Sequence, residues 1–348
     1  MVCLLLCSKP VSGRSIRTDT VQNTTLTFKL NDLPIGFIPQ HDASPTPMAD
    51  INTVLSQGAK GVGNTYRSAT FGWYAQVYPG LPFKGEQLLK IKDDVIKSGA
   101  IFEIAIMPLR SYDGFTAQDP SQAIAVAKVL QQFTQAGVQV RLRFGHEMNY
   151  YGNPTRGEYI YSNDTGAFKE AFKQMSIAAK QYCQDKAQMV FNPNSGSLAE
   201  IDSWAPDPST YSMIALDYYA PSRKSLSVAN YLSVVQPFYQ KYGQNGSKQY
   251  IIAETSLQYN STIDDRLRWL LVLSDPKIRQ TLKSLQSLTW FNLNKDFPFE
   301  IVYPPSDPAN APLIKMVSSS MNKRKPLFVA LRRSLALLFL VSGLIEIT

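Results

Sequence analysis

The stretch VQVRLRFGHEMN, residues 138–149, alternates apolar and polar side chains and then ends in a group of polar residues. Alternation of this kind over several residues is typical of a β-strand with one buried face. The run closes on His146 and Glu147, and His146 is one of only two histidines in the chain. The stretch therefore predicts a strand that presents a histidine and a carboxylate at its carboxyl end.

Seven other β-rich runs occur along the chain. The eight predicted strands cover residues 35–40, 64–74, 101–110, 138–149, 188–195, 212–221, 249–259 and 287–294. Longer amphipathic segments lie between most of them, which favours parallel strands joined by crossover helices. This order predicts an α/β fold, a (β/α)8 TIM barrel over residues 33–321. No G-x-G-x-x-G or P-loop motif follows the first strand, which argues against a nucleotide-binding doubly wound sheet.

The predicted helices carry ordinary start and stop signals. Segments 85–99 and 119–137 each end on a glycine, and segment 164–185 opens on Asp164, a suitable N-cap residue. Segments 228–243 and 261–285 continue the pattern. The helices therefore fall where a barrel needs its crossovers.

Positive charge is concentrated at the two ends of the chain. The 348 residues carry a formal net charge of +8, of which residues 1–30 contribute +3 and residues 322–348 contribute +4. The remainder carries only +1, so the body of the protein does not have the basic surface that nucleic acid binding requires. The 18 tyrosines suit a hydroxyl-rich ligand as well as packing.

Residues 1–32 and 322–348 are predicted to be extensions of the barrel domain. The first resembles a clipped signal segment, and four N-glycosylation acceptors (Asn23, Asn163, Asn245 and Asn260) fit a secreted protein. The apolar stretch 335–345 is shorter than the ~20 residues of a membrane-spanning helix, so a packed helix or an irregular extension is favoured over membrane association. Three cysteines cannot form a disulfide framework. We expect a secreted monomer.

The active site of such a barrel lies at the carboxyl ends of its strands. The polar and aromatic residues that end the last five predicted strands are Arg143, His146, Glu147, Asn149, Asn192, Asn194, Asp217, Tyr218, Tyr219, Glu254, Trp290 and Asn292. Trp73 and Tyr74, near the end of the second strand, are candidates for stacking on a sugar or for core packing. His41 and His146 do not provide metal ligands at zinc-like spacing, so no metal and no other cofactor is expected.

Glu147 and Glu254 lie 107 positions apart, close to three strand–helix units of about 35 residues. This spacing places them on the fourth and seventh strands, facing each other across the barrel mouth. Glycoside hydrolysis requires two such carboxyl groups, one as proton donor and the other as nucleophile if they are about 5 to 5.5 Å apart. The apolar run before Glu254 predicts a buried carboxylate that needs hydrogen-bond donors to stay ionised, and Tyr219 and Arg143 could provide them.

The motifs RFGHEMN at 143–149 and AET at 253–255 resemble those of the family 26 glycoside hydrolases, and the resemblance covers residues 33–321. These are retaining (β/α)8-barrel enzymes that mostly cleave β-mannans, and some act on mixed-linkage β-glucan or β-xylan. The resemblance implies that Glu147 is the acid/base, that Glu254 is the nucleophile and that Arg143 lines the site. It further implies that Tyr219, in the Asp217-x-Tyr219 motif, contacts the nucleophile and that Trp290 is a sugar platform.

The loop after Glu147 departs from the usual pattern of the family. Mannanases of the family commonly carry tryptophan there, and this chain reads Tyr150-Tyr151-Gly152-Asn153. The strand-three position where the family has a sugar-binding histidine offers Arg110 instead. The expected substrate-binding residues are Arg143, His146, Asn149, Tyr151, Tyr219 and Trp290.

Structural interpretations of these residues remain open beside the functional ones. The two glutamates could be salt-bridged strand ends, Arg143 could neutralise Glu147, and His146 and Trp290 could be core residues. The expected function is a retaining glycoside hydrolase acting on a β-1,4-linked, mannan-type polysaccharide. The alternatives are a mixed-linkage β-glucan or β-xylan hydrolase of the same fold, a transglycosylase, and a non-catalytic carbohydrate-binding protein.

Overall fold

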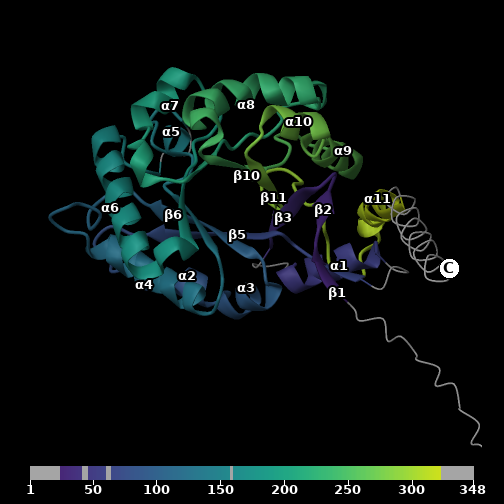
Figure 1. Cartoon of the computed structure of the whole chain (residues 1–348), viewed down its shortest axis with the longest axis horizontal. Helices are drawn as coiled ribbons and strands as arrows, with labels where there is room; N and C mark the ends of the chain where they lie inside the picture. The colour runs from purple at the N-terminus through teal and green to yellow at the C-terminus, as the bar shows by residue number, and fades with distance from the viewer. Residues whose placement is uncertain (1–23, 41–45, 60–63, 157–159, 323–348) are drawn as a thin grey trace, which may run out of the picture.

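A closed ring of parallel strands lies inside a ring of helices (Figure 1). The computed structural model describes residues 24–40, 46–59, 64–156 and 160–322. Its barrel strands are β3 (Leu33–Ile38), β5 (Thr70–Val77), β6 (Ile101–Pro108), β7 (Val140–Phe144), β8 (Ala187–Phe191), β9 (Met213–Ala215), β10 (Gln249–Thr255) and β11 (Leu285–Phe291). Each pairs in parallel with the next, and β11 pairs with β3. Within the described residues these eight strands confirm the predicted (β/α)8 barrel.

The helices alternate with the strands and cover the outside of the ring (Figure 1). The α-helices are α1 (Met48–Gln57), α2 (Glu86–Leu89), α3 (Lys92–Ser98), α4 (Ser121–Gln135), α5 (Met148–Tyr151), α6 (Thr165–Cys183), α7 (Leu198–Trp204), α8 (Val228–Tyr242), α9 (Ile263–Leu273), α10 (Pro276–Thr281) and α11 (Ala311–Asn322). Short 3-10 turns are η1 (Gln184–Lys186), η2 (Pro208–Thr210), η3 (Arg223–Ser225), η4 (Gln244–Gly246) and η5 (Pro308–Asn310). As predicted, the Asp164 carboxylate caps α6 by accepting a hydrogen bond from Ala167 N at 2.9 Å.

The second predicted strand is divided into two elements. Residues 64–67 form β4, which pairs in parallel with β1 (Thr24–Thr27) outside the barrel, and β5 starts only at Thr70. The chain turns at Ser68, whose N–H donates to Asn52 Oδ1 at 2.7 Å and whose hydroxyl donates to Thr70 O at 2.6 Å. A single strand over 64–74 is therefore wrong, because side-chain hydrogen bonds interrupt the ladder there.

The segment predicted as an N-terminal extension contributes to the described structure, because its β2 (Lys29–Leu30) pairs antiparallel with β3. Of the predicted C-terminal extension, only Asn322 is described, as the last residue of α11. This helix lies beside α1, and the Ser318 hydroxyl donates to Gly58 O at 2.8 Å. Residues 1–13, on which the signal-segment prediction rests and which include Cys3 and Cys7, lie outside the described residues, as do His41 and the apolar stretch 335–345. No helix in the described ranges is long and apolar enough to cross a membrane.

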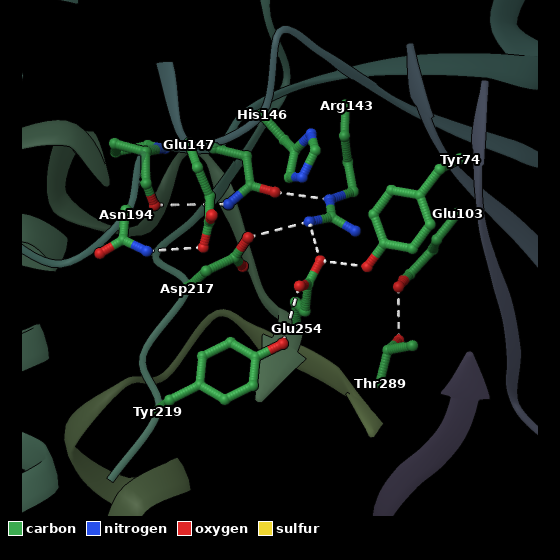
Figure 2. A network of polar contacts seen from close by, with 12 residues as sticks. Tyr74, Glu103, Arg143, His146, Glu147, Asn194, Asp217, Tyr219, Glu254 and Thr289 are labelled. Carbon is green, nitrogen blue, oxygen red and sulfur yellow. Dashed lines mark hydrogen bonds and ion pairs between the residues drawn. The ribbon is translucent and has the colours of Figure 1, made fainter. Parts of the chain in front are cut away.

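The barrel interior contains a buried layer of polar side chains. Arg141, on β7, donates from Nη1 to Glu103 Oε1 on β6 and to Ser287 on β11, each at 2.6 Å. Thr289 donates to the second oxygen of Glu103 (Figure 2). The Thr289 hydroxyl also hydrogen-bonds to the Thr70 hydroxyl at 2.6 Å. Because a strand's side chains alternate in direction, Arg143 also points inward, one layer closer to the carboxyl ends of the strands. The inward-facing polar layers thus lead up to the candidate site.

Candidate active site

A cavity of about 640 Å³ opens at the carboxyl ends of the barrel strands. We call it the mouth cavity; its lining residues are Trp73, Tyr74, Gln76, Gln87, Lys90, Met107, His146, Glu147, Tyr150, Tyr151, Arg156, Asn194, Ser195, Tyr219, Glu254, Gln258, Phe291, Leu293, Lys295, Asp296, Phe297 and Phe299. Glu147 and Glu254 both line it, which brings together the two carboxyl groups that the sequence places on separate strands.

Glu147 lies in a tight turn that ends β7. Gly145 and Glu147 have φ angles of 56° and 53°, the left-handed region that a glutamate rarely adopts. A Cβ on Gly145 would lie 2.8 Å from the ring of Phe168. Glu147 N–H donates to Asn192 O at 2.7 Å, and Glu147 O accepts from the N–H groups of Tyr150 and Tyr151 at the start of α5. The turn therefore holds the Glu147 side chain at the cavity in a strained backbone conformation.

The carboxyl group of Glu147 has one side-chain donor, the Asn194 amide. Asn194 Nδ2 donates to Glu147 Oε1 at 2.6 Å (Figure 2). Burial, followed by the negative charges of Glu254 and Asp217, raises the pKa of Glu147 well above its usual range, against the Asn194 hydrogen bond. Glu147 thus retains its proton at a pH where an exposed glutamate has lost it.

Glu254 has three donors around its carboxylate. Tyr219 donates to Oε1 at 2.7 Å, while Tyr74 and Arg143 Nη2 donate to Oε2 at 2.6 and 2.7 Å (Figure 2). Burial alone would raise the pKa of Glu254, but the charge of Arg143 and the hydrogen bonds from Tyr74 and Arg143 outweigh it and lower the pKa. Burial and the charge of Glu254 raise the pKa values of Tyr74 and Tyr219, so both phenols stay protonated and able to donate.

Arg143 is fully buried behind the cavity wall. Its Nη2 also donates to Asp217 Oδ2 at 2.8 Å, and its Nε donates to Asn192 Oδ1 at 2.5 Å. Burial raises the pKa of Asp217 to about 8, a shift that Arg143 opposes and Glu254 reinforces. Arg143 therefore pairs with Glu254 and Asp217 rather than neutralising Glu147, and it does not line the cavity, which corrects the expectation that it contacts substrate directly.

His146 lines the cavity as a neutral imidazole. Burial and the charge of Arg143 lower its pKa to about 3. Its ring lies between those of Tyr74 and Tyr151, with centroids 5.4 and 5.7 Å away, and Nδ1 is 3.4 Å from the Tyr161 hydroxyl. A charge-free histidine held in this way can present a ring nitrogen to a sugar hydroxyl.

Two other predicted contact residues lie outside the cavity. Asn149 directs both ends of its amide to the backbone of Asn194, donating to Asn194 O at 2.9 Å and accepting from Asn194 N at 2.8 Å. Trp290 is fully buried, and its indole N–H donates to Phe299 O at 2.8 Å. A stacking platform needs an exposed ring face, so the platform prediction for Trp290 is wrong. Strand alternation turns Thr289 and Phe291 into the barrel and Trp290 away from it, and Phe291 lines the cavity.

The remaining predicted residues, Tyr151 and Tyr219, line the cavity with His146. Sequence reasoning missed that Tyr74 and Asn194 each hydrogen-bond to one of the two glutamates. Strand alternation alone could have placed Tyr74 inside the barrel, given an inward-facing Thr70 on the same strand. In the described part of the chain, no three His, Cys, Asp or Glu side chains are arranged to hold a metal ion.

The fold and the site define a (β/α)8 barrel with two buried, electrostatically distinct carboxyl groups at its mouth. Similar solved structures are a mannanase of Bacillus subtilis (15% identity, 81% of this chain and 84% of that chain, TM-score 0.54) and a family 26 β-mannanase of Bacteroides ovatus (13%, 86% and 88%, TM-score 0.54). A family 26 endo-β-1,4-mannanase of a Bacillus species is similar to the same degree (12%, 82% and 85%, TM-score 0.53).

These likenesses confirm that the chain has the fold of the family 26 β-mannanases. No protein-family model and no curated protein sequence matches the chain.

Proposed function

We propose that the protein is a retaining glycoside hydrolase that cleaves a β-1,4-linked polysaccharide of mannan type. The observation that carries the proposal is the opposite environment of the two cavity carboxyl groups, since the pKa of Glu147 is raised and that of Glu254 is lowered. A proton donor and an ionised nucleophile are the two forms that double displacement requires at one pH. The substrate class is supported by the fold, which is that of proteins named as β-mannanases.

In the first step the Glu254 carboxylate attacks the anomeric carbon while Glu147 gives its proton to the departing glycosidic oxygen. The bond between the anomeric carbon and that oxygen breaks, and a glycosyl ester of Glu254 forms. In the second step Glu147, now a carboxylate, takes a proton from water, and the water oxygen displaces Glu254 from the same carbon. Tyr74, Tyr219 and Arg143 stabilise the Glu254 carboxylate before attack and after release.

The test is hydrolysis of β-1,4-mannan, glucomannan, mixed-linkage β-glucan and β-xylan by the wild type and by two variants. Glu254→Ala and Glu147→Ala should each lose about 10³-fold or more of kcat/KM on the polymer. On an aryl β-glycoside, added azide should give the β-glycosyl azide with Glu147→Ala and the α-glycosyl azide with Glu254→Ala, because only the first variant still forms the ester. If both variants are as active as the wild type, the proposal is wrong. If the wild type binds a polysaccharide but releases no reducing sugar, the protein is a carbohydrate-binding protein instead.

We further propose that the protein acts outside the cell, where a polysaccharide is accessible. The acceptors Asn163 and Asn260 are both exposed, as N-glycosylation requires. Expression through a secretory host should give a protein whose mass falls on enzymatic deglycosylation. An unmodified, unsecreted product would contradict this location.

A further inference from the structure

Three tyrosine side chains surround the His146 imidazole at the wall of the mouth cavity. The rings of Tyr74 and Tyr151 pack against it, with centroids 5.4 and 5.7 Å away. The third, Tyr161, is fully buried and does not line the cavity. Its hydroxyl lies 3.4 Å from His146 Nδ1, at the long end of the range for a hydrogen bond. The proposed mechanism gives Tyr161 no role.

Tyr161 is held in place by its backbone and by its ring. The N–H groups of Ile160 and Tyr161 both donate to Tyr151 O at 3.0 Å. The rings of Tyr151 and Tyr161 meet edge to face, with centroids 5.7 Å apart. Burial raises the pKa of Tyr161 well above its usual range, so the phenol retains its proton. The hydroxyl is therefore a fixed group with one hydrogen that needs an acceptor.

Nδ1 of His146 is the acceptor for this hydrogen. In the part of the chain that the structure describes, Nδ1 is the one hydrogen-bond partner of the Tyr161 hydroxyl. A proton on Nδ1 would reverse the bond and leave the phenol hydrogen buried without an acceptor, which is costly. A bare Nδ1 lets the phenol donate and leaves no buried hydrogen unpaired. Because His146 is neutral, its single ring proton then lies on Nε2.

Nε2 is the ring nitrogen that remains for a ligand. Among the described residues it has no hydrogen-bond partner, and it is not one of the unpaired polar atoms that are sealed from solvent. Since His146 lines the mouth cavity, a ligand there can reach this nitrogen. With its proton on Nε2, the ring is a hydrogen-bond donor toward the cavity and not an acceptor.

We propose that Tyr161 is a positioning residue that fixes the His146 imidazole with its proton on Nε2, so that His146 donates a hydrogen bond to an oxygen of the bound glycan. The inference rests on the proposed function and assigns a part in substrate binding to a residue outside the cavity. Without the Tyr161 hydroxyl the proton can occupy either ring nitrogen, and a molecule with a bare Nε2 cannot donate to the glycan. Tyr161 therefore acts on affinity rather than on the chemical step.

Nitrogen-15 NMR of the histidine side chains measures the position of the ring proton directly. The chain has two histidines, so His41→Gln leaves the His146 signals alone in the spectrum. In this protein at neutral pH we expect a protonated Nε2 and a bare Nδ1. Adding Tyr161→Phe should move both nitrogens toward intermediate shifts, because the two tautomers then interconvert. Tyr231→Phe is the matched control: it removes another buried hydroxyl, 3.0 Å from that of Tyr250 and outside the cavity, and should leave the His146 spectrum unchanged.

Kinetics on β-1,4-mannan separate this role from packing. Tyr161→Phe should raise KM about two- to fivefold and leave kcat nearly unchanged, because the lost hydrogen bond is made in the ground state as well as in the transition state. His146→Gln provides an amide N–H donor that does not depend on Tyr161. In that background Tyr161→Phe should raise KM no further, whereas a purely structural role would give the same loss in both backgrounds.

A proton on Nδ1 when Tyr161 is intact would overturn the inference without any Tyr161 variant. A His146 spectrum that Tyr161→Phe leaves unchanged would overturn it as well. Hydrolysis of mannan by a protein whose His146 tautomers are mixed would leave the proposed function standing and reject the inference alone. A proton fixed on Nε2 by Tyr161, with no hydrolysis of any polymer, would do the reverse.

Discussion

The two glutamates of the mouth cavity differ in how many donors face them. Glu254 accepts hydrogen bonds from Arg143 and two tyrosines, and Glu147 accepts one from Asn194. Donors stabilise the ionised form, so this asymmetry divides the roles of nucleophile and acid between chemically identical side chains. Activity should therefore fall at acidic pH as Glu254 gains a proton, since its pKa is lowered, and at alkaline pH as Glu147 loses one, since its pKa is raised.

Tyr74→Phe removes one donor from Glu254 without removing its charge partner. The pKa of Glu254 should rise, so the acidic limb of the kcat/KM profile moves to higher pH, and kcat/KM at its optimum should fall by about 10- to 100-fold. Tyr231→Phe is the control, because the Tyr231 hydroxyl lies 3.0 Å from that of Tyr250 and outside the cavity. A Tyr74→Phe profile that overlays the wild type would show that this hydrogen bond does not tune the nucleophile.

Asn194→Ala should move the alkaline limb of the kcat/KM profile. The Asn194 amide stabilises the ionised form of Glu147, so its loss raises the pKa of Glu147 further and shifts the alkaline limb to higher pH. Asn149→Ala should act in the same direction but less, because Asn149 only holds the Asn194 backbone. Stopped assays across the alkaline range measure both shifts. An alkaline limb that moves downward would contradict the assignment of Glu147 as the acid.

Sequence patterns predict the two carboxyl groups of the site better than their surroundings. Glu147 follows β7 and Glu254 lies near the end of β10, at barrel spacing, and both line the cavity. Asn194 follows a strand too, but it lies 47 positions from Glu147 in the sequence. Its contact with Glu147 depends on the turn after β7 and on Asn149, which holds the Asn194 backbone. The platform prediction for Trp290 used only its position at the end of a strand. Side chains alternate in direction along β11, and the neighbouring Thr289 is the one that faces the barrel interior.

At the scale of elements, sequence patterns located the barrel strands but not the residues at which the strands end. The predicted fourth strand continued to Asn149, whereas β7 stops at Phe144 and α5 starts at Met148. The polar residues between them read as a continued alternation, but Gly145 permits a left-handed conformation that ends the ladder. The turn after β7, rather than the strand itself, positions Glu147.

Gly145→Ala tests this turn. An alanine there must adopt a φ near 56° and also meets the buried ring of Phe168, so we expect a loss of about 2–4 kcal/mol in the free energy of unfolding. Gly80→Ala has a φ of similar sign, 73°, with no atom near the added Cβ, so it should lose only about 1 kcal/mol. Urea unfolding of the two variants measures the difference, and equal losses would show that the Phe168 contact is not limiting.

At the scale of the whole molecule, the barrel is closed over an interior that is charged as well as apolar. The ring closes where β11 meets β3, and the Glu103–Arg141 pair lies buried inside it, bonded to Thr289 and Ser287 of β11. Local periodicity predicts strands and helices, so the (β/α)8 class was predictable from the sequence. The interior layers were not, because they depend on the register between strands that are distant in the sequence.

Arg141→Met should destabilise the whole barrel by about 3–5 kcal/mol at neutral pH, because it leaves the Glu103 carboxylate buried without its cation. The double variant Glu103→Gln/Arg141→Met should recover most of that loss, since the remaining amide carries no charge. Urea unfolding of the wild type and both variants at neutral pH measures these differences. If the single and double variants are equally unstable at neutral pH, then packing around Arg141, and not its charge, holds the barrel interior together.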